Sequence, residues 1–401
     1  MHFPDDLVLR DAKGTILLVV LDGLGGLPRE AGLRITELED ARTPNLDALA
    51  RRSSLGMICP VAPGVTPGSG PGHLALFGYD PVEHLVGRGA LSALGVGFDL
   101  APGDLAVRLN LATLDAGGLV VDRRAGRPAD AEGRRIVERL GSGISLGPEV
   151  EIFLFHESEH RVVLVVRAEG LGAGIADTDP QRTGVPPLEP RSLDAASGRA
   201  ARLVADFLAQ ARALLADEPA ATGLLARGFA RHERLPSLRE RFGLDAVVVA
   251  CYPMYRGVAR LVGMRVAGEP STDREAVELM EEQFGNADLH FIHFKAPDAR
   301  GEDRSFDAKV EAIEAVDRLV PRLQALGADV LAVTGDHSTP ARMGAHSWHH
   351  VPLLLASASA RPTGGAFSER ECRTGDIGTI EGRHLMSLML AHAGRLAKFG
   401  A

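Results

Sequence analysis

The sequence has little lysine, few aromatic residues and more acidic than basic side chains. Aromatic residues make up 4% of the 401 residues, the formal net charge is −9, and only four residues are lysine: Lys13, Lys295, Lys309 and Lys398. General nucleic-acid binders usually carry a basic surface, and single-strand binders stack bases on aromatic side chains. We therefore expect no nucleic-acid partner.

Cysteine is also scarce. The three cysteines, Cys59, Cys251 and Cys372, lie far apart in the chain, and no CxxC pair occurs. Disulfide frameworks need an even set of cysteines, and thiolate zinc sites commonly use CxxC pairs. The sequence therefore predicts neither kind of site, and we expect unpaired thiols in a reducing compartment.

Long hydrophobic runs, targeting signals and nucleotide-binding motifs are missing as well. No apolar run approaches the ~20 residues of a membrane span, and the N-terminal MHFPDD lacks the pattern of a signal peptide. No P-loop motif occurs, and Pro28 occupies the third-glycine position of the only dinucleotide-like loop. We expect a cytoplasmic protein with no membrane partner.

Short apolar runs alternate with helical patterns. The runs Thr15–Leu21, Ala287–Phe294 and Ala328–Thr334 are typical of buried parallel strands, and each ends abruptly in polar residues. Helical periodicity covers Pro44–Arg51 and Ala308–Leu326, and Pro321 is expected to kink or split the second helix. At 45% hydrophobic residues, the chain has ample core for two or three domains of an α/β protein.

The middle of the chain has a different pattern. Short alternating runs such as Arg161–Arg167 and one long helical stretch, Ala200–Leu215, predict an inserted α+β domain. We expect residues 1–98 and 236–401 to form the core and residues 99–235 to form the insert. The run Val247–Ala250 is expected to return to the core.

The glycine-rich loop Gly64–His73 precedes a helical segment. Pro71 suits a first helical turn, and the N–H groups there could bind phosphate while the glycines allow a close approach. Ser69 would then be a nucleophile, provided that a base or metal activates it. The alternative is an ordinary turn with a capping serine.

Acidic residues and histidines follow the three predicted strands. The candidates are Asp22, Asp298, Glu302, Asp303, Asp336, His337 and His346. Carboxylates and neutral imidazoles bind Mn, Zn, Fe or Mg, and the carboxyl ends of parallel strands meet at one edge of a sheet. The alternative for each residue is a solvated charge or a buried structural histidine; their grouping at three strand ends favours a metal site.

Arginines and one lysine provide candidates for anion binding. Arg108, Arg123, Arg124 and Arg161 lie in the predicted insert, and guanidinium groups bind carboxylates and phosphates in bidentate fashion. Lys295 directly follows a predicted strand. In so arginine-rich a chain, ordinary surface arginines are the alternative.

Several motifs together resemble the alkaline-phosphatase superfamily, and within it the archaeal-type family of cofactor-independent phosphoglycerate mutases. They occur in order along almost the whole chain: VLDGLGGLP, TPNLDALA, TPGSGPGHLALFGYDP, GRGALSALG, RLNLATLD, VDRRAGR, ADTDP, HFKAPDARGEDRSFDAK, VTGDHSTP, HSWHHVP and KFGA. The resemblance implies an alkaline-phosphatase-like α/β core, with a parallel-rich sheet flanked by helices, and a smaller inserted α+β domain.

The resemblance also implies two divalent metal ions, with Mn expected first and Mg, Co or Zn as alternatives, and no 2,3-bisphosphoglycerate. By position, Asp22, Ser69, Asp336 and His337 would hold one ion, and Asp298, Glu302 and His346 the other. Ser69 would be the nucleophile, Lys295 would neutralise the phosphoryl group, and Asp122 would transfer protons. Substrate would be bound by His73, Arg108, Arg123, Arg124 and Arg161.

Two positions depart from the family pattern. Related two-metal mutases generally have histidine where this chain has Glu302, and a carboxylate there would favour Mn or Mg. Ser92 stands where many relatives carry an acidic residue.

The function that the resemblance implies is interconversion of 2-phosphoglycerate and 3-phosphoglycerate through a phosphoserine, with a small phosphorylated hydroxy acid as substrate. The alternatives are a homoserine kinase-like phosphotransferase, a metal-dependent phosphomonoesterase and a metal-binding protein without activity. The sequence leaves open whether the protein is a homo-oligomer.

Overall fold

The structure is a computed structural model that describes residues 5–84, 86–231 and 234–400. The described residues of 1–85 and 235–401 form one compact unit, and those of 86–234 form a second. Helix α4 (Arg88–Gly95), which we placed in the core, packs on strands β3 (Leu105–Leu114) and β7 (Gly223–Arg231) of the second unit. The expected division into a core of residues 1–98 and 236–401 and a substrate-binding insert of residues 99–235 stays a prediction. The two compact units are instead divided after residue 85 and after residue 234.

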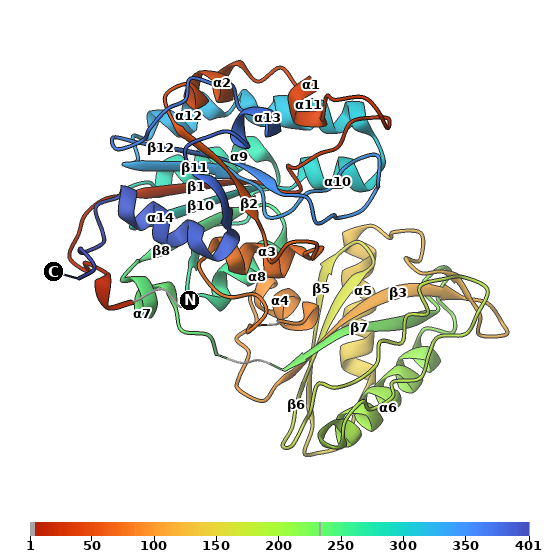
Figure 1. Cartoon of the computed structure of the whole chain (residues 1–401). Coiled ribbons are helices and arrows are strands. Elements are labelled where there is room, and N and C mark those ends of the chain that lie inside the picture. The colour runs from red at the N-terminus through yellow and green to blue at the C-terminus, as the bar shows by residue number, and fades with distance from the viewer. Residues whose placement is uncertain (1–4, 85, 232–233, 401) are drawn as a thin grey trace. The chain divides into compact units, whose positions relative to one another are not determined.

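The first unit is built on an eight-stranded sheet (Figure 1). Its strands are, in spatial order, β13 (Gly378–Glu381), β2 (Ser54–Cys59), β12 (Val351–Ser357), β11 (Val330–Thr334), β1 (Ile16–Leu21), β10 (Leu289–Phe294), β8 (Ala246–Ala250) and β9 (Arg265–Val266). Strands β11, β1, β10, β8 and β9 are parallel, and β12 is antiparallel to both of its neighbours.

Helices cover both faces of this sheet (Figure 1). One face carries α2 (Pro44–Ala50), α9 (Asp273–Gln283), α11 (Phe306–Asp317), α12 (Val320–Ala325) and α13 (Glu369–Cys372), and the other carries α3 (Ser69–Leu76), α8 (Pro253–Leu261) and α14 (Leu385–His392). Every residue of β1, β10 and β11 is buried, because both faces are covered. The predicted helix 308–326 is split in two, with Pro321 in the first turn of α12, where its missing N–H costs nothing.

Shorter helices complete the first unit. They are α1 (Glu37–Asp40), α7 (Leu238–Phe242) and α10 (Ala296–Glu302). Helix α10 follows β10 directly and contacts both α11 and β1, so it places its side chains at the end of the central strands.

The second unit has an antiparallel sheet. Strand β3 pairs with β6 (Arg161–Arg167) and β7, its end pairs with β4 (Val120–Asp122), and β6 also pairs with β5 (Glu151–Ser158). The helices α5 (Asp130–Gly143) and α6 (Gly198–Leu214) bury their apolar side chains in a core that is separate from that of the first unit. The predicted fold class, an α/β core with a parallel-rich sheet plus a smaller α+β part, is confirmed.

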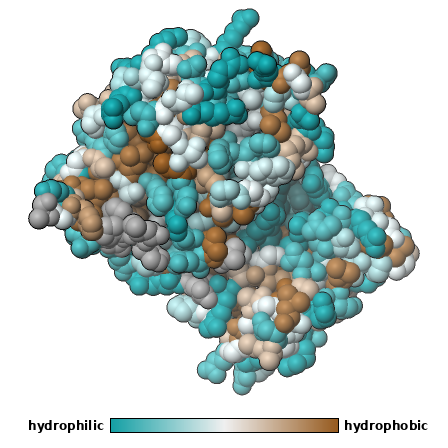
Figure 2. Space-filling model, viewed as in Figure 1, coloured by the Kyte–Doolittle hydropathy of each residue, from teal (hydrophilic) through white to brown (hydrophobic). Residues whose placement is uncertain are grey.

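Hydrophilic residues cover most of the face shown in Figure 2, and hydrophobic residues form small patches on it. Among the described residues, no helix has both the length and the apolar composition needed to span a membrane.

Candidate active site

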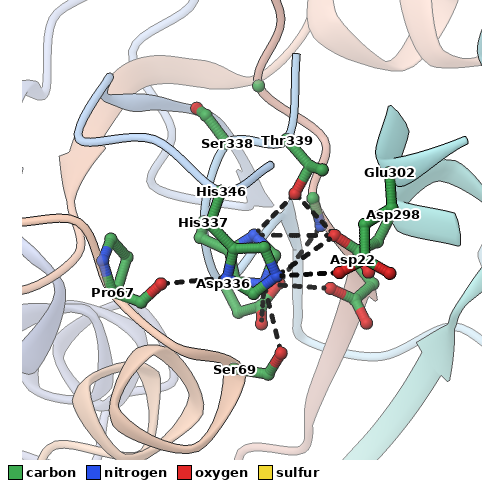
Figure 3. A network of polar contacts seen from close by, with 12 residues as sticks. Asp22, Pro67, Ser69, Asp298, Glu302, Asp336, His337, Ser338, Thr339 and His346 are labelled. Carbon is green, nitrogen blue, oxygen red and sulfur yellow. Dashed lines mark hydrogen bonds and ion pairs between the residues drawn. The ribbon is translucent and has the colours of Figure 1, made fainter. Parts of the chain in front are cut away.

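The predicted polar residues lie at one edge of the large sheet, where the parallel strands β1, β10 and β11 end. Figure 3 shows the side chains of Asp22, Asp298 and His337 close together. Asp22 follows β1, Lys295 follows β10, and Asp336 and His337 come two and three residues after the end of β11. Asp298, on α10, lies beside them, and all of these side chains except Lys295 are fully buried. The sequence-based expectation that these strand ends converge is therefore met by the geometry.

Ser69 lies at the first position of α3, after the N-cap residue Gly68. Helix α3 passes very close to the loop after β11, since a Cβ on Gly72 would lie 2.4 Å from the carbonyl oxygen of Asp336. Only glycine permits this approach. As a result, Ser69 Oγ lies 3.2 Å from His337 Nε2.

Asp22, Asp336 and His337 form the first group of ligand atoms that could hold a cation. His337 Nε2 lies 3.3 Å from Asp22 Oδ1 and 3.2 Å from Asp336 Oδ2. Within the described part of the chain, these two buried carboxylate oxygens have no hydrogen-bond partner. Buried oxygens without donors are costly, so this donor set fits a divalent ion that binds oxygen and imidazole nitrogen.

Asp298, His337 and His346 form the second group. His346 Nε2 lies 3.6 Å from Asp298 Oδ1, and the rings of His337 and His346 are stacked with centroids 3.7 Å apart. Glu302 Oε1 is 3.8 Å from His346 Nε2, and its side chain is 55% exposed. Glu302 therefore stands at the open rim of this group, and its role as a ligand stays a prediction.

Lys295 is held by three oxygen atoms behind these groups. Its Nζ donates to Asp22 Oδ2 at 3.0 Å, to the Tyr255 hydroxyl at 2.9 Å, and to Asp298 Oδ2. Burial disfavours both charges, yet the pKa of Lys295 is raised by Asp22 and that of Asp22 is held well below its usual value by Lys295. The lysine therefore remains a cation at this position.

His73, predicted to bind substrate, is fully buried in α3. Its Nδ1 lies 2.8 Å from the Ser69 carbonyl oxygen and 3.2 Å from Asp336 Oδ2. Burial lowers its pKa, but Asp336, Asp22 and the hydrogen bond to the Ser69 carbonyl together raise the pKa above the usual value. The described contacts of His73 are thus with the protein groups that surround Ser69.

Arginines of the second unit create a strongly positive environment around His160. Burial, followed by the charges of Arg161, Arg108, Arg124 and Arg127, lowers the pKa of this histidine to about 3. A neutral imidazole among several guanidinium groups is a suitable setting for a carboxylate or phosphate. Three of the four predicted substrate arginines thus influence the charge of His160, although Arg161 also pairs with Glu159 at 3.3 Å.

Arg123, the fourth predicted arginine, has a different environment. It forms a bidentate ion pair with Asp179, whose side chain is completely buried. Asp122 likewise has protein partners, because its two carboxylate oxygens accept the backbone N–H groups of Arg124 at 2.8 Å and Gly126 at 2.7 Å. Both residues therefore organise the loop that carries Arg124.

Ser92, the unusual residue of α4, has a specific partner. Its hydroxyl lies 3.3 Å from both carboxylate oxygens of Glu157, a buried residue on β5. The side chain of Arg108 also faces this carboxylate, at 3.9 Å. Ser92 is thus a hydrogen-bond donor to an acid that another strand supplies.

Four residues of the first unit escaped the sequence analysis. Tyr255 and His293 lie behind Asp22, Thr339 lies between His337 and Asp298, and Lys309 lies beneath the loops. Rarity was the only signal for Tyr255, since the chain has three tyrosines, whereas His293 and Lys309 are the first and last residues of the motif HFKAPDARGEDRSFDAK. Thr339 follows the Asp336-His337 pair within the motif VTGDHSTP, which could have drawn attention to it.

Lys309 is a buried cation that joins two loops. Its Nζ donates to the carbonyl oxygens of Gly23 at 2.8 Å, Gly25 at 3.0 Å and Thr339 at 2.8 Å. The first two belong to the loop after β1 and the third to the loop after β11, so one ammonium group fixes both segments that carry candidate ligands.

Comparisons with known proteins identify the family of this chain. The family model for 2,3-bisphosphoglycerate-independent phosphoglycerate mutase matches residues 50–221. A Thermus thermophilus protein named as a probable mutase of this kind is 52% identical over 390 residues, which cover 96% of each chain. The chain belongs to this mutase family.

Solved structures support the family membership. A Pyrococcus horikoshii protein is 32% identical with a TM-score of 0.83, covering 97% of this chain and 100% of its own. A cofactor-independent phosphoglycerate mutase from Thermoplasma acidophilum is 29% identical with a TM-score of 0.69, covering 95% of this chain and 100% of its own. The resemblance found in the sequence motifs is therefore confirmed, and the mutase family is one that works without 2,3-bisphosphoglycerate.

Proposed function

We propose that the protein interconverts 2-phosphoglycerate and 3-phosphoglycerate, a step of glycolysis and gluconeogenesis, through a phosphoserine at Ser69. One observation carries the proposal: in a chain of the mutase family, Ser69 Oγ lies 3.2 Å from His337 Nε2, at the junction of two acid–histidine groups. A hydroxyl so placed at a helix N-terminus has the surroundings that a phosphate-accepting nucleophile needs.

We expect two divalent metal ions, with Mn first and Mg, Co or Zn as alternatives. Asp22, Ser69, Asp336 and His337 would hold one ion, and Asp298, Glu302 and His346 the other; the unpaired oxygens of Asp22 and Asp336 support this assignment. Ions bound there would supply Lewis-acid chemistry, which lowers the pKa of a hydroxyl and offsets phosphate charge.

The transfer itself takes place at Ser69. Its Oγ loses its proton and forms a bond to phosphorus, while the bond between phosphorus and the glycerate oxygen breaks and one proton is taken up by that oxygen. Glycerate then turns so that its other hydroxyl loses its proton and attacks the phosphoserine; the bond between phosphorus and Ser69 Oγ breaks, and one proton returns to Oγ. Lys295, already a cation between Asp22 and Asp298, would balance the charge on the phosphoryl group.

The arginine group of the second unit would bind the anionic substrate. Arg108, Arg124 and Arg161 are assigned to its carboxylate or phosphate, because guanidinium groups bind such anions and because, after burial, the charges of these three arginines and Arg127 lower the pKa of His160. Arg123 and His73 contact Asp179 and Asp336, respectively, and substrate binding by these two residues stays a prediction. The proton transfer predicted for Asp122 stays a prediction, since its described contacts organise a loop.

Phosphorus NMR of the pure protein with 3-phosphoglycerate and Mn²⁺, sampled after quenching with chelator, tests the function. Without nucleotide or 2,3-bisphosphoglycerate, 2-phosphoglycerate should form while total ester stays constant. Growth of inorganic phosphate instead would mean a phosphomonoesterase. No change unless ATP and homoserine are supplied would mean a kinase, and no reaction at all would mean a protein without activity.

The remaining expectations concern location and assembly. We propose a cytoplasmic protein, supported by the substrate class and by three free cysteines among the described residues. The absence of a nucleic-acid partner stays a prediction, and light scattering of the purified protein would establish its oligomeric state.

A further inference from the structure

The hydroxyl group of Thr339 lies between the two candidate ligand groups (Figure 3). Thr339 Oγ1 is 2.5 Å from Asp298 Oδ1 and 3.0 Å from His337 Nδ1. Thr339, Asp298 and His337 are all fully buried. This single hydroxyl therefore links an acid of one group to a histidine that belongs to both.

The chemistry of the partners decides where the protons lie. An ionised carboxylate can only accept, so the one proton of the Thr339 hydroxyl goes to Asp298 Oδ1, the nearer partner. The hydroxyl oxygen must then accept its second hydrogen bond, and the donor is His337 Nδ1–H. A neutral His337 protonated on Nδ1 has a lone pair on Nε2, the atom that lies 3.2 Å from Ser69 Oγ.

The tautomer of His346 is fixed by a backbone carbonyl group. Its Nδ1 lies 3.0 Å from the carbonyl oxygen of Pro67, which can only accept a hydrogen bond. Its Nε2 faces Asp298 and Glu302. Both histidines of the second group thus turn Nε2 toward carboxylates. Only the tautomer of His337 depends on a hydroxyl group, that of Thr339, whose direction is set by Asp298.

The position of Thr339 is fixed independently of its side chain. Its backbone N–H lies 3.2 Å from the carbonyl oxygen of Gly23 and 3.1 Å from that of Gly25, and its own carbonyl accepts from Lys309 Nζ at 2.8 Å. A Cβ on Gly301 would lie 2.2 Å from the same carbonyl oxygen, so helix α10 also packs tightly against it. The hydroxyl consequently has little freedom to choose other partners.

We infer that Thr339 is a positioning residue, which holds His337 in the Nδ1–H tautomer so that the Nε2 lone pair faces Ser69 and a bound cation. The inference rests on the proposed function only for the role of the cation. The hydrogen-bond chain runs from Ser69 through His337 and Thr339 to Asp298, and it joins the two groups through one side chain. Outer partners of this kind orient metal-binding histidines and raise their basicity.

Two variants separate the hydroxyl from the shape of the side chain. Thr339→Val keeps the volume and removes the hydroxyl, whereas Thr339→Ser keeps the hydroxyl. In protein with protonated, ¹⁵N-labelled histidine on an otherwise deuterated background, freed of metal by chelation, long-range ¹H–¹⁵N spectra report the tautomer of His337. Its signals are assigned by their loss in His337→Asn. We expect the Nδ1–H form in the wild-type protein and in Thr339→Ser, and a mixture or the Nε2–H form in Thr339→Val.

Calorimetric titration with Mn²⁺ gives a second readout. We expect Thr339→Val to bind Mn²⁺ roughly ten- to hundredfold more weakly, with Thr339→Ser close to wild type and circular dichroism unchanged in both. An Nε2–H tautomer in the wild-type protein would overturn the inference, even if Thr339→Val failed to fold. So would a Thr339→Val variant with unchanged tautomer and unchanged affinity.

Neither measurement uses phosphoglycerate. An Nδ1–H tautomer together with a negative mutase assay would therefore reject the proposed function and leave the positioning role of Thr339 intact.

Discussion

The ring of Tyr255 is stacked on the imidazole of His293, with centroids 3.6 Å apart and planes inclined by 23°. This stacking directs the Tyr255 hydroxyl to Asp22 Oδ2, to which it donates, while the same hydroxyl accepts from Lys295 Nζ at 2.9 Å. The tyrosine belongs to α8, far along the chain from Asp22, and it fixes the relative positions of an acid and a cation in the candidate active site.

Replacing Tyr255 with phenylalanine should therefore impair catalysis. We expect kcat to fall roughly tenfold or more, since loss of a hydrogen bond to a charged group costs about 1.5–3 kcal/mol, with little change in KM. Steady-state kinetics at saturating Mn²⁺ measures the effect. Tyr252→Phe is the matched control, three residues earlier, and wild-type kcat in Tyr255→Phe would contradict the assignment.

Removing the nucleophile should abolish the reaction. For Ser69→Ala we expect a fall in kcat of at least ~10³-fold, because no other described hydroxyl occupies the position of Ser69 Oγ near His337 Nε2. The fold and most Mn²⁺ binding should persist. Phosphorus NMR measures turnover. The control is Thr66→Ala, because Thr66 is an exposed residue of the same loop. Normal turnover in Ser69→Ala would rule out the phosphoserine.

Two arginines of the second unit should respond differently to the same substitution. Arg161→Gln weakens the positive group around His160, so KM for 3-phosphoglycerate should rise roughly ten- to hundredfold with the melting temperature almost unchanged. Arg123→Gln deprives the buried Asp179 of its bidentate partner and should destabilise the fold by roughly 3 kcal/mol. Steady-state kinetics and urea unfolding of both variants test this contrast. Equal effects of the two substitutions on KM and on the free energy of unfolding would contradict it.

Glu369 should make stability depend on pH. Burial raises its pKa to about 7, although it accepts hydrogen bonds from Thr36 Oγ1 and from the backbone N–H of Gly26. Its folded-state pKa exceeds the value of 4.5 for an unperturbed glutamate. Its contribution is therefore complete below about pH 4.5 and is lost as the pH rises through about 7.

Glu369→Gln should remove this dependence. Between pH 5 and pH 8, we expect the free energy of unfolding of the wild-type protein to fall relative to that of the variant, by up to about 3 kcal/mol. Urea unfolding across this range measures the difference. Glu30→Gln, at an exposed position, should keep the wild-type pH profile; an identical profile in Glu369→Gln would refute the assignment.

Lys309→Met should destabilise the protein and weaken metal binding together. Three backbone carbonyl oxygens lose a charged donor, which should cost roughly 3 kcal/mol or more. The loops after β1 and β11 should loosen, so Mn²⁺ affinity should fall as well. Lys13→Met, at an exposed lysine, is the control. Stability and affinity equal to those of the wild type would show that the ammonium group does not hold these loops.

The sequence alone determined the α/β class and most of the candidate ligands. Apolar runs that end in Asp22, Lys295 and the Asp336-His337 pair mark parallel strands, and parallel strands have their carboxyl ends at one edge. The local motif around Ser69 likewise predicted a helix start, and α3 begins at that residue. These features depend on short-range pattern and on a general rule of topology.

The tertiary structure alone decided which side chains orient these residues. Tyr255 reaches Asp22 across 233 positions of the chain, Lys309 reaches Gly23 across 286, and Thr339 reaches Asp298 across 41. It also decided that Arg123 pairs with Asp179, and it placed α4 with the second unit. No periodicity or motif encodes such partners, because a hydrogen bond between distant residues depends on how whole elements pack, which the local sequence leaves undetermined.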